Sequence, residues 1–481
     1  MSLRARTAKN IGIVAFLQLF ASAINIITLI VLARLLTPFD FGIIGLVAVV
    51  LGAIGQFNDF GLGPAVIQRQ KDVEEALYTG GALRIVMALG LFVLSFLLAP
   101  YVAILFNTPE MTDVMRIAAL MFFLSSAGFV STNRLTKELE FGKIAYVTVV
   151  ISVTSSVTSV LIAWIWQTYW AMIVGPMIGS LLGLLALYKV CPWKARFRID
   201  RRIAKELMAY GKHVFLMVFI MFLVANLDDA VVASVLGVTI LGYYYVAYRW
   251  SNVVAGFLLK LAYRVMFPTF SQIQKDGARL KRGYVEMLRI ISLASFPTYF
   301  GFIVVAPDFV NVLLGGEWSR AILPLQILCL FGLINVLATP AGHVFLAIGK
   351  SKLLSMSNLL NLVVLLVFIY PAASAYGLEG VSVLVVMMYL IYMIVMFWLA
   401  TKNIDISFSE IGDIFRGPFL SAFAMLLLIV ILRAILGFGL VPFIVIVIAG
   451  VGVYSVLIYA YQGELIRGYY HELRSIIKGQ P

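Results

Sequence analysis

The sequence predicts an all-α, polytopic membrane protein of about fourteen transmembrane helices, built as two pseudo-symmetric six-helix lobes plus two extra C-terminal helices. Three observations lead to this prediction: the composition, the spacing of the apolar runs and an internal repeat. Hydrophobic residues make up 62% of the 481 residues and charged residues only 12%. Because that is about half the charged fraction of a typical globular protein, the composition excludes an ordinary soluble fold.

Apolar runs long enough to cross the hydrocarbon core as helices recur along the whole chain. The predicted spans lie near residues 11–33, 41–60, 80–99, 114–133, 144–166, 170–188, 213–234, 240–263, 285–305, 321–347, 353–370, 379–400, 417–436 and 440–461. The first run continues without interruption to Ala33 and is therefore longer than the apolar core of a signal peptide. We therefore expect residues 11–33 to form an uncleaved first helix.

Basic residues concentrate in alternate connecting segments, above all 189–212 and 264–289, and both ends of the chain fall on this same side. The positive-inside rule then predicts a multi-pass protein of the plasma (inner) membrane with both termini in the cytoplasm. The net charge of +13 reflects this topology and contact with anionic membrane lipids. No nucleic-acid partner is needed to explain it.

The connecting segments also suggest a domain organisation. We predict an N-lobe of helices 1–6 (1–190), a cytoplasmic linker (191–212), a C-lobe of helices 7–12 (213–400), and two additional helices with a cytoplasmic tail (401–481). In the linker, RFRIDRRIAKELMAY (196–210) places Ile199, Ile203 and Leu207 four residues apart, with most basic residues elsewhere on the helix. This pattern is typical of an amphipathic helix on the inner leaflet.

An internal repeat supports the two lobes. VLARLLTPFDFGIIGLV (31–47) and VVASVLGVTILGYYYVA (231–247) align without a gap at an offset of 200 residues. The alignment pairs Val31 with Val231, Ala33 with Ala233, Leu36 with Leu236 and Gly42 with Gly242. Each copy covers the end of a lobe's first helix, a short outer turn and the start of its second helix. Parallel repeats of this kind place a substrate path between the lobes.

Several segments together resemble the polysaccharide transporter (oligosaccharide flippase) branch of the multidrug/oligosaccharidyl-lipid/polysaccharide flippase superfamily. They are ARLLTPFDFG (33–42), DFGLGPAVIQRQ (59–70), NLDDAVVASVLGVTILGYYYVAYRW (226–250), FPTFSQIQKD (267–276) and LLGGEWSRAILPLQIL (313–328). The resemblance covers most of the chain to about residue 330 and implies a two-lobed flippase. Such a protein exports a lipid-linked oligosaccharide of the polyprenyl-diphosphate type to the outer leaflet by alternating access, for cell-surface polysaccharide assembly.

Two other functions were weighed against this one. An ion-coupled multidrug or cation antiporter of the same superfamily would share the fold, but we expect its cavity to be lined with acids more than with arginine. A membrane glycosyltransferase or polymerase would display a sizeable extramembrane loop with catalytic acids, whereas all the outer loops here are short. We therefore expect no enzyme and no catalytic residues, and contact with a polysaccharide polymerase or with glycosyltransferases as partners.

Three arginines are candidates for binding the diphosphate or an acidic sugar, because a guanidinium group offers a rigid fork of donors to phosphate oxygens. They are Arg34, Arg84 and Arg249, and we expect them to line the cavity between the lobes. Arg84 lies near the inner end of its predicted helix, where a side chain that reaches back to the interface is the alternative. The histidines are too far apart in sequence to suggest a local metal site.

The stretch NLDDAVVASVL (226–236) contains two acidic residues in an apolar run, and Asp228 stands where the transporter family often has Asp after Asn-Leu. A charge at mid-bilayer is costly, so Asp228 should face protein or water. It is expected either to pair with Arg249, to bind a coupling ion, or to lie in a solvated outer vestibule. Asn358 and Asn361, spaced i, i+3, would supply carbonyl oxygens to Na⁺. The resemblance implies coupling to Na⁺ or H⁺ and no other cofactor.

Overall fold

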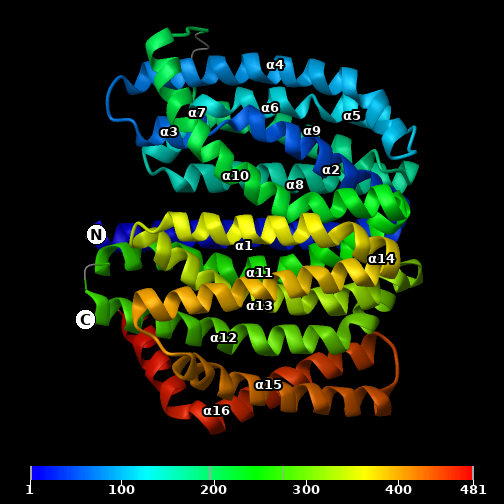
Figure 1. The fold of residues 1–481 in the computed structure, drawn as a ribbon, viewed down its shortest axis with the longest axis vertical. Coiled ribbons are helices and arrows are strands. Elements are labelled where there is room, and N and C mark those ends of the chain that lie inside the picture. Colours follow the sequence, from blue (N-terminus) through cyan, green and yellow to red (C-terminus); the bar gives the residue numbers. More distant parts are fainter. Residues whose placement is uncertain (1–2, 194–196, 275, 479–481) are drawn as a thin grey trace. The chain divides into compact units, whose positions relative to one another are not determined.

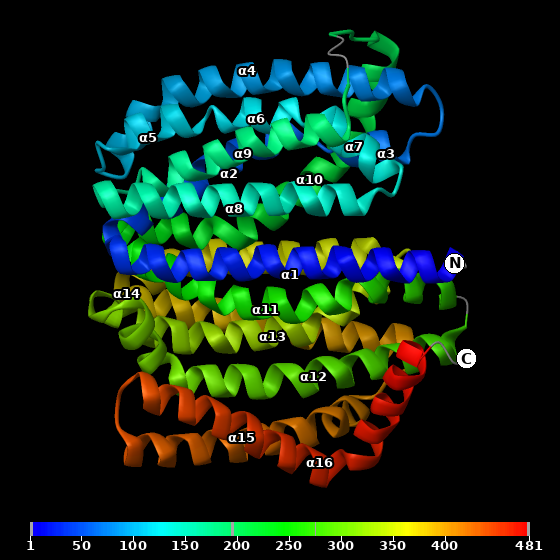
Figure 2. The same cartoon turned by 180° about the vertical axis from the view of Figure 1, so that it is seen from behind.

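The computed structural model describes residues 3–193, 197–274 and 276–478, and these residues form helices joined by turns and short loops, with no β-strand among them. The side chains of residues 3–11, 213, 257–258, 260–269, 271–272, 351 and 464–478 are outside this description. The chain forms two compact units, Met1–Tyr245 and Val246–Pro481. Figures 1 and 2 show the helices of these units from opposite sides.

The helices of the first unit are α1 (Leu3–Leu35), α2 (Pro38–Asp59), α3 (Leu62–Gln68), α4 (Val73–Leu105), α5 (Met111–Ala118), α6 (Met121–Ala127), α7 (Phe129–Lys137), α8 (Phe141–Trp166), α9 (Ala171–Val190) and α10 (Arg201–Leu236). Helix α11 (Val238–Ile273) begins in this unit and continues into the second. The second unit adds α12 (Gly277–Asp308), a π-helical turn (Phe309–Leu314), a 3₁₀ turn (Gly316–Ala321), α13 (Ile322–Ala347), α14 (Ser351–Ile404), α15 (Phe408–Leu436) and α16 (Leu440–Lys478).

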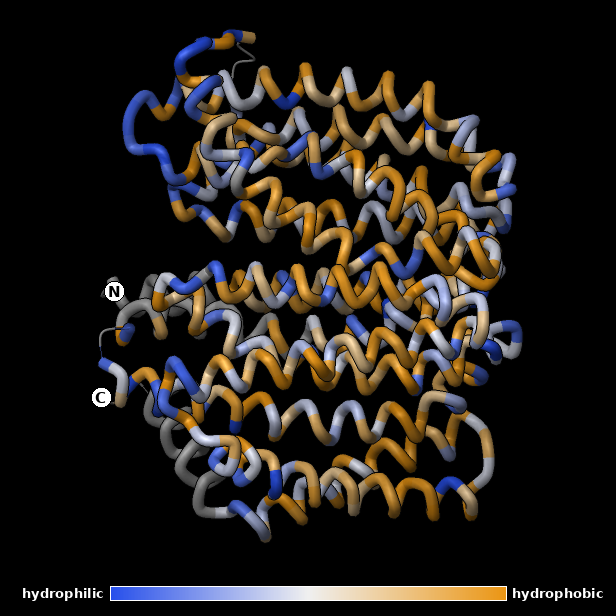
Figure 3. The backbone as a smooth tube through the Cα atoms, viewed as in Figure 1, coloured by the Kyte–Doolittle hydropathy of each residue, from blue (hydrophilic) through white to orange (hydrophobic). Residues whose placement is uncertain are grey.

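The all-α membrane fold agrees with the sequence prediction. Among the described residues, eleven helices are long and apolar enough to cross a membrane, or twelve if the bent pair Met111–Ala127 and Phe129–Lys137 forms one span. Figure 3 shows apolar residues along the lengths of these helices and hydrophilic residues in many of the connecting turns. Helix α14 contains two predicted spans, joined at Gly377 with a non-helical backbone (φ 61°, ψ −143°). The count of about fourteen stays a prediction.

Close helix packing in the first unit depends on small residues. A Cβ atom added to Gly175 on α9 would lie 1.9 Å from Ser159 Oγ on α8, and one added to Gly179 would lie 1.9 Å from Ser155 Oγ. Gly183, one turn further along α9, faces Ile151 of α8 in the same way. Lipid tails are as apolar as the helices, so such close van der Waals contact is a main source of helix association in a bilayer.

The predicted linker helix is not a separate surface element. Residues Arg201–Leu236 form one helix, α10, and Asp200 caps its first turn. Ile203 and Leu207 are buried in a core with residues of α3, α4 and α7 instead of facing outward. Ion pairs Arg69–Glu206 (2.6 Å) and Arg202–Asp72 (3.0 Å) attach the same turns to the segment between α3 and α4. The amphipathic pattern is therefore satisfied by protein, not by a lipid surface.

The division into units also differs from the predicted lobe boundary near residue 212, because α10 packs against α2. Phe215 on α10 stacks with Phe60 at a centroid distance of 4.9 Å and contacts Phe57 at 4.8 Å. A Cβ on Gly211 would lie 2.2 Å from the carbonyl oxygen of Phe60. At this point α2 ends, since Phe60 (φ 38°) and Gly61 (φ 67°) both adopt the left-handed conformation. The two six-helix lobes remain a prediction.

The last two helices belong to the second unit and pack on α12. Phe296 of α12 contacts Phe415 and Phe419 of α15 edge-on, each at a centroid distance of 5.8 Å. Tyr454 of α16 donates a hydrogen bond to the carbonyl oxygen of Leu293 on α12 at 2.8 Å. Aromatic contacts and one interhelical hydrogen bond thus attach both helices to α12.

Candidate functional site

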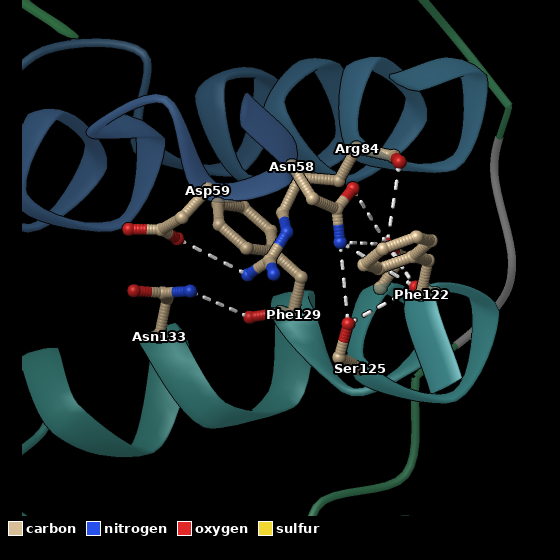
Figure 4. A network of polar contacts seen from close by, with 8 residues as sticks. Asn58, Asp59, Arg84, Phe122, Ser125, Phe129 and Asn133 are labelled. Atoms are coloured by element: carbon tan, nitrogen blue, oxygen red, sulfur yellow. Dashed lines mark hydrogen bonds and ion pairs between the residues drawn. The ribbon is translucent and has the colours of Figure 1, made fainter. Parts of the chain in front are cut away.

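Arg84, one of the three candidate arginines, lies in a polar network of the first unit (Figure 4). It projects from α4, and its side chain is 14% exposed. Its Nη1 atom lies 3.4 Å from Oδ1 of Asp59, the last residue of α2, and its guanidinium carbon lies 5.2 Å from the centroid of the Phe129 ring. Its Nε has no hydrogen-bond partner among the described residues. Arg84 therefore joins α2, α4 and α7 within this unit.

Asn58, the residue before Asp59 on α2, is buried and forms hydrogen bonds with residues of α6. Its amide nitrogen donates to the hydroxyl groups of Ser125 and Ser126, each at 3.2 Å. The Ser126 hydroxyl in turn donates to the carbonyl oxygen of Arg84 at 3.2 Å. Figure 4 shows the Asn58 amide directed toward Ser125 on one side of the Arg84 side chain. A buried amide in an apolar helix is thus hydrogen-bonded to a neighbouring helix.

Arg34 and Arg249 have more open surroundings than Arg84. Arg34 is exposed in the last turn of α1, in the first unit. Arg249 is exposed on α11, in the part of that helix that belongs to the second unit. Arg34 and Arg249 are therefore more exposed than Arg84, which is largely enclosed by protein.

Asp228 and Asp229 are both buried within α10, with 3% and 6% of their surfaces exposed. The Tyr244 hydroxyl, from the first turns of α11, donates a hydrogen bond of 2.6 Å to Oδ2 of Asp228. The Oδ1 atoms of both aspartates have no hydrogen-bond partner among the described residues. Buried acceptors without donors are costly, and a proton or a small cation would relieve that cost. These oxygens therefore fit a coupling ion by their chemistry.

Tyr244 is a part of this arrangement that the sequence prediction did not include. It occupies an apolar-looking run, GYYYVA, and its surface is fully buried. The prediction also favoured Asp228 over Asp229, whereas the structure buries both carboxylates. The burial of Asp229 was foreseeable only in part, because adjacent helical residues point about 100° apart and usually have different surroundings.

Asn358 and Asn361 lie in the first half of α14, in the second unit. Asn361 is 2% exposed, and its Oδ1 has no hydrogen-bond partner among the described residues, whereas Asn358 is half-buried. Asn361 thus presents a buried oxygen of the type that Na⁺ prefers.

A buried ion pair in the second unit was not foreseen. Arg433 of α15 places its Nε 3.0 Å from Oδ2 of Asp308, which is 1% exposed at the end of α12. The Arg433 Nη1 atom also donates to the carbonyl oxygen of Val304 at 3.2 Å, and its guanidinium group lies over the Phe438 ring. An arginine near the end of an apolar helix is commonly an interfacial anchor, and its spacing along the chain does not reveal a buried partner. Asp308 within the apolar run 302–314 was the available signal.

Residues 31–323, more than half of the chain, match the family described as "Polysaccharide biosynthesis protein". A membrane protein in the cps region of Klebsiella pneumoniae, itself uncharacterised, is 24% identical over 475 residues, which cover 97% of each chain. The lipopolysaccharide biosynthesis protein WzxC of Escherichia coli (strain K12) is 26% identical over 349 residues, or 72% of this chain and 71% of WzxC.

Among solved structures, the inward closed conformation of the lipid II flippase MurJ superposes with a TM-score of 0.76. The match covers 94% of this chain and 99% of the MurJ chain at 15% sequence identity. At this identity the likeness concerns the fold alone. Together, the apolar helices and these relatives identify a multi-pass membrane protein.

Proposed function

Because this chain belongs to the polysaccharide biosynthesis protein family, we propose that it is a flippase for a lipid-linked oligosaccharide. The substrate is of the polyprenyl-diphosphate type and moves from the inner to the outer leaflet for cell-surface polysaccharide assembly. The family match over residues 31–323 carries this proposal. A relative whose name places it in lipopolysaccharide biosynthesis and a fold shared with a lipid II flippase support it further.

The substrate's diphosphate is recognised by exposed arginines. Arg34 and Arg249 are exposed residues, and a guanidinium group can bind phosphate oxygens through two parallel N–H donors. Arg84 has a different task, because Asp59 and the Phe129 ring already occupy its side chain. We assign Arg84 to holding α2 against α4 near the break at Phe60 and Gly61.

Transport is coupled to an ion that binds at Asp228 in the first unit, and Asn358 and Asn361 in the second unit stay predicted oxygen ligands. The unpartnered Oδ1 atoms of Asp228 and Asn361 favour a cation or, at the carboxylate, a proton. Coupling requires the ion to bind one access state more tightly than the other, because an ion of equal affinity for both states shifts no population. Na⁺ and H⁺ both satisfy this chemistry.

The orientation follows from the distribution of basic residues. Both termini lie in the cytoplasm, where the basic segments 189–212 and 264–289 contact anionic lipid headgroups. The protein resides in the plasma (inner) membrane and passes its product to a polysaccharide polymerase or to glycosyltransferases.

Reconstitution into liposomes tests the transport proposal. A fluorescent lipid-linked oligosaccharide is placed in both leaflets, and the fraction in the outer leaflet is measured with a membrane-impermeant quencher or lectin. Wild-type protein should accelerate exchange between leaflets, and Arg34→Gln and Arg249→Gln should each slow it by about tenfold, the value of one lost charge-assisted contact of roughly 1.5 kcal/mol.

Arg320→Gln is the matched control, since Arg320 is an exposed arginine in the 3₁₀ turn of the second unit. This variant should retain wild-type exchange. If wild-type vesicles leave the oligosaccharide in place but expel cationic drugs under an ion gradient, the protein is an antiporter and the flippase proposal is wrong.

A further inference from the structure

The second unit contains a cavity of about 680 Å³ where α12, α15 and α16 meet. Its polar walls come from six residues: Arg289, Glu410, Asp413, Tyr459, Tyr461 and Gln462. Helical spacing explains part of this convergence, because residues three apart in a helix, such as Glu410 and Asp413, share one helix face. The volume lies within the roughly 300–1,000 Å³ typical of small-ligand sites.

A break in α16 shapes this cavity. Gln462 has non-helical backbone angles (φ −131°, ψ 33°), and Figure 2 shows α16 changing direction toward its C-terminal end. Gly417 of α15 makes room for the break. A Cβ atom there would lie 2.7 Å from both Gln462 Nε2 and the Tyr461 ring. The amide oxygen of Gln462 is buried and has no hydrogen-bond partner among the described residues.

The ionised groups of the cavity are unequally paired. Glu410 lies 2.8 Å from Lys281 Nζ and also caps α15 through Ser407, so its charge is balanced. Among the residues with described side chains, Arg289 has one ion-pair partner, Glu286 on its own helix, at 3.8 Å. Asp413 is exposed and belongs to no ion pair among the described residues. The cavity therefore offers two acceptors without donors, Asp413 and the Gln462 amide oxygen, and one weakly paired cation.

We infer that this cavity binds the headgroup of phosphatidylethanolamine. A primary ammonium group has three N–H donors and suits the carboxylate of Asp413 and the Gln462 amide oxygen. The phosphate of the same headgroup suits the guanidinium group of Arg289. Tyr459 and Tyr461 are 47% and 54% exposed, and their rings offer apolar surface to the glycerol and acyl region.

The position of the cavity agrees with a lipid ligand. Most of its residues come from three segments that the sequence predicts at the inner face: the basic segment 264–289, the segment 401–416 and the tail from Gln462. Tyr459 and Tyr461 lie at the adjoining end of the last predicted span. Other headgroups fit less well. Phosphatidylglycerol lacks the cation for Asp413, and phosphatidylcholine carries a quaternary ammonium with no N–H to donate.

Lipid retention by the purified full-length protein tests this inference. Detergent-purified protein is incubated with equimolar phosphatidylethanolamine, phosphatidylglycerol and phosphatidylcholine of identical acyl chains, and the bound lipids are counted by native mass spectrometry. Wild-type protein should retain phosphatidylethanolamine preferentially. Asp413→Asn and Gln462→Met should each reduce this retention by about tenfold, while Glu317→Gln, an exposed acid elsewhere in the unit, should leave it unchanged.

Each contrary outcome has a distinct meaning. Equal retention of the three lipids, or wild-type retention by Asp413→Asn, overturns the inference. A third outcome is that the protein retains no lipid but soluble phosphoethanolamine raises the melting temperature of the lipid-free protein. The ligand would then be a soluble phosphate ester, and the inference of a bound lipid would be wrong. The melting temperatures of the lipid-free variants check their folding. Because the assay measures binding without transport, its failure is separate from a failure of the flippase proposal.

Discussion

Gly42 on α2 and Gly242 on α11 lie where these two helices come so close together that neither position has room for a side chain. A Cβ atom on Gly42 would lie 1.9 Å from the carbonyl oxygen of Val238, and one on Gly242 would lie 1.7 Å from that of Pro38. Each carbonyl belongs to the residue four positions before the opposite glycine. The contact is therefore reciprocal, and its residues are related by the 200-residue offset of the internal repeat.

Alanine at either glycine should destabilise the protein strongly. The nearest atoms are backbone, which cannot rotate away, so Gly42→Ala and Gly242→Ala should each lower the unfolding free energy by about 3 kcal/mol or more. Gly90→Ala on α4 is the control, because a Cβ there has no atom within 4 Å, and it should be neutral or gain up to about 1 kcal/mol. Unfolding followed by intrinsic fluorescence in detergent measures both. Equal stability of Gly42→Ala and Gly90→Ala would contradict the close contact.

Asp228→Asn should abolish the response of transport to an ion gradient, because the amide can neither hold a proton nor neutralise a cation. Transport is measured in liposomes with and without an imposed Na⁺ or H⁺ gradient, and Arg249→Gln serves as the matched variant. Tyr244→Phe removes only the 2.6 Å hydrogen bond to Asp228 and should keep the gradient response. If Asp228→Asn keeps the gradient dependence of the wild type, the carboxylate has a structural role and the coupling hypothesis is wrong.

Arg433→Met should cost about 3 kcal/mol of unfolding free energy, because it leaves the buried carboxylate of Asp308 without its cation. Asp308→Asn should cost less, since the Arg433 side chain is 23% exposed and can turn to solvent. Arg320→Met replaces an exposed arginine of the same unit and should change stability by less than about 0.5 kcal/mol. Denaturant titration compares the three variants, and a similar cost for Arg433→Met and Arg320→Met would refute this role of the ion pair.

Asp200 should make the stability of the protein depend on pH. Its carboxylate accepts hydrogen bonds from the backbone N–H groups of Ile203 and Arg202, and these bonds, that from Ile203 foremost, lower the pKa of Asp200 below its usual 3.8. A lowered folded-state pKa means that the stabilisation is complete above the unfolded value and is lost as the pH falls through the folded value. The stabilising effect of Asp200 should therefore shrink between about pH 5 and about pH 3.

The variant Asp200→Asn isolates this effect, because asparagine also caps helices but does not titrate. The difference in melting temperature between wild type and Asp200→Asn should be larger at the upper end of that pH range than at the lower end. Asp405→Asn, at an exposed carboxylate between α14 and α15, is the control for general charge effects. A difference that is constant across the range would rule out the titration of Asp200 as its cause.

Hydropathy predicted the helices well because it is a local property of the chain. Each predicted span falls on a helical part of the structure, and the repeat was placed on matching elements: α1 ends at Leu35 and α2 begins at Pro38, while α10 ends at Leu236 and α11 begins at Val238. The linker was predicted to be an amphipathic helix on the inner leaflet, whereas its residues Ile203 and Leu207 are buried against other helices. The pattern of Ile203 and Leu207 shows which helix face is apolar, but not whether lipid or protein covers that face.

The sequence by itself determined the membrane class, the helical segments, the repeat and which polar residues enter apolar helices, because these depend on composition and on periodicity along the chain. Only the tertiary structure decided the partners of those polar residues. It pairs Arg84 with Asp59, Asp308 with Arg433 and Asp228 with Tyr244. The physical reason is that a buried charge or hydroxyl is stabilised by whichever group folding brings within about 3 Å, and helix packing, not spacing along the chain, determines which group that is.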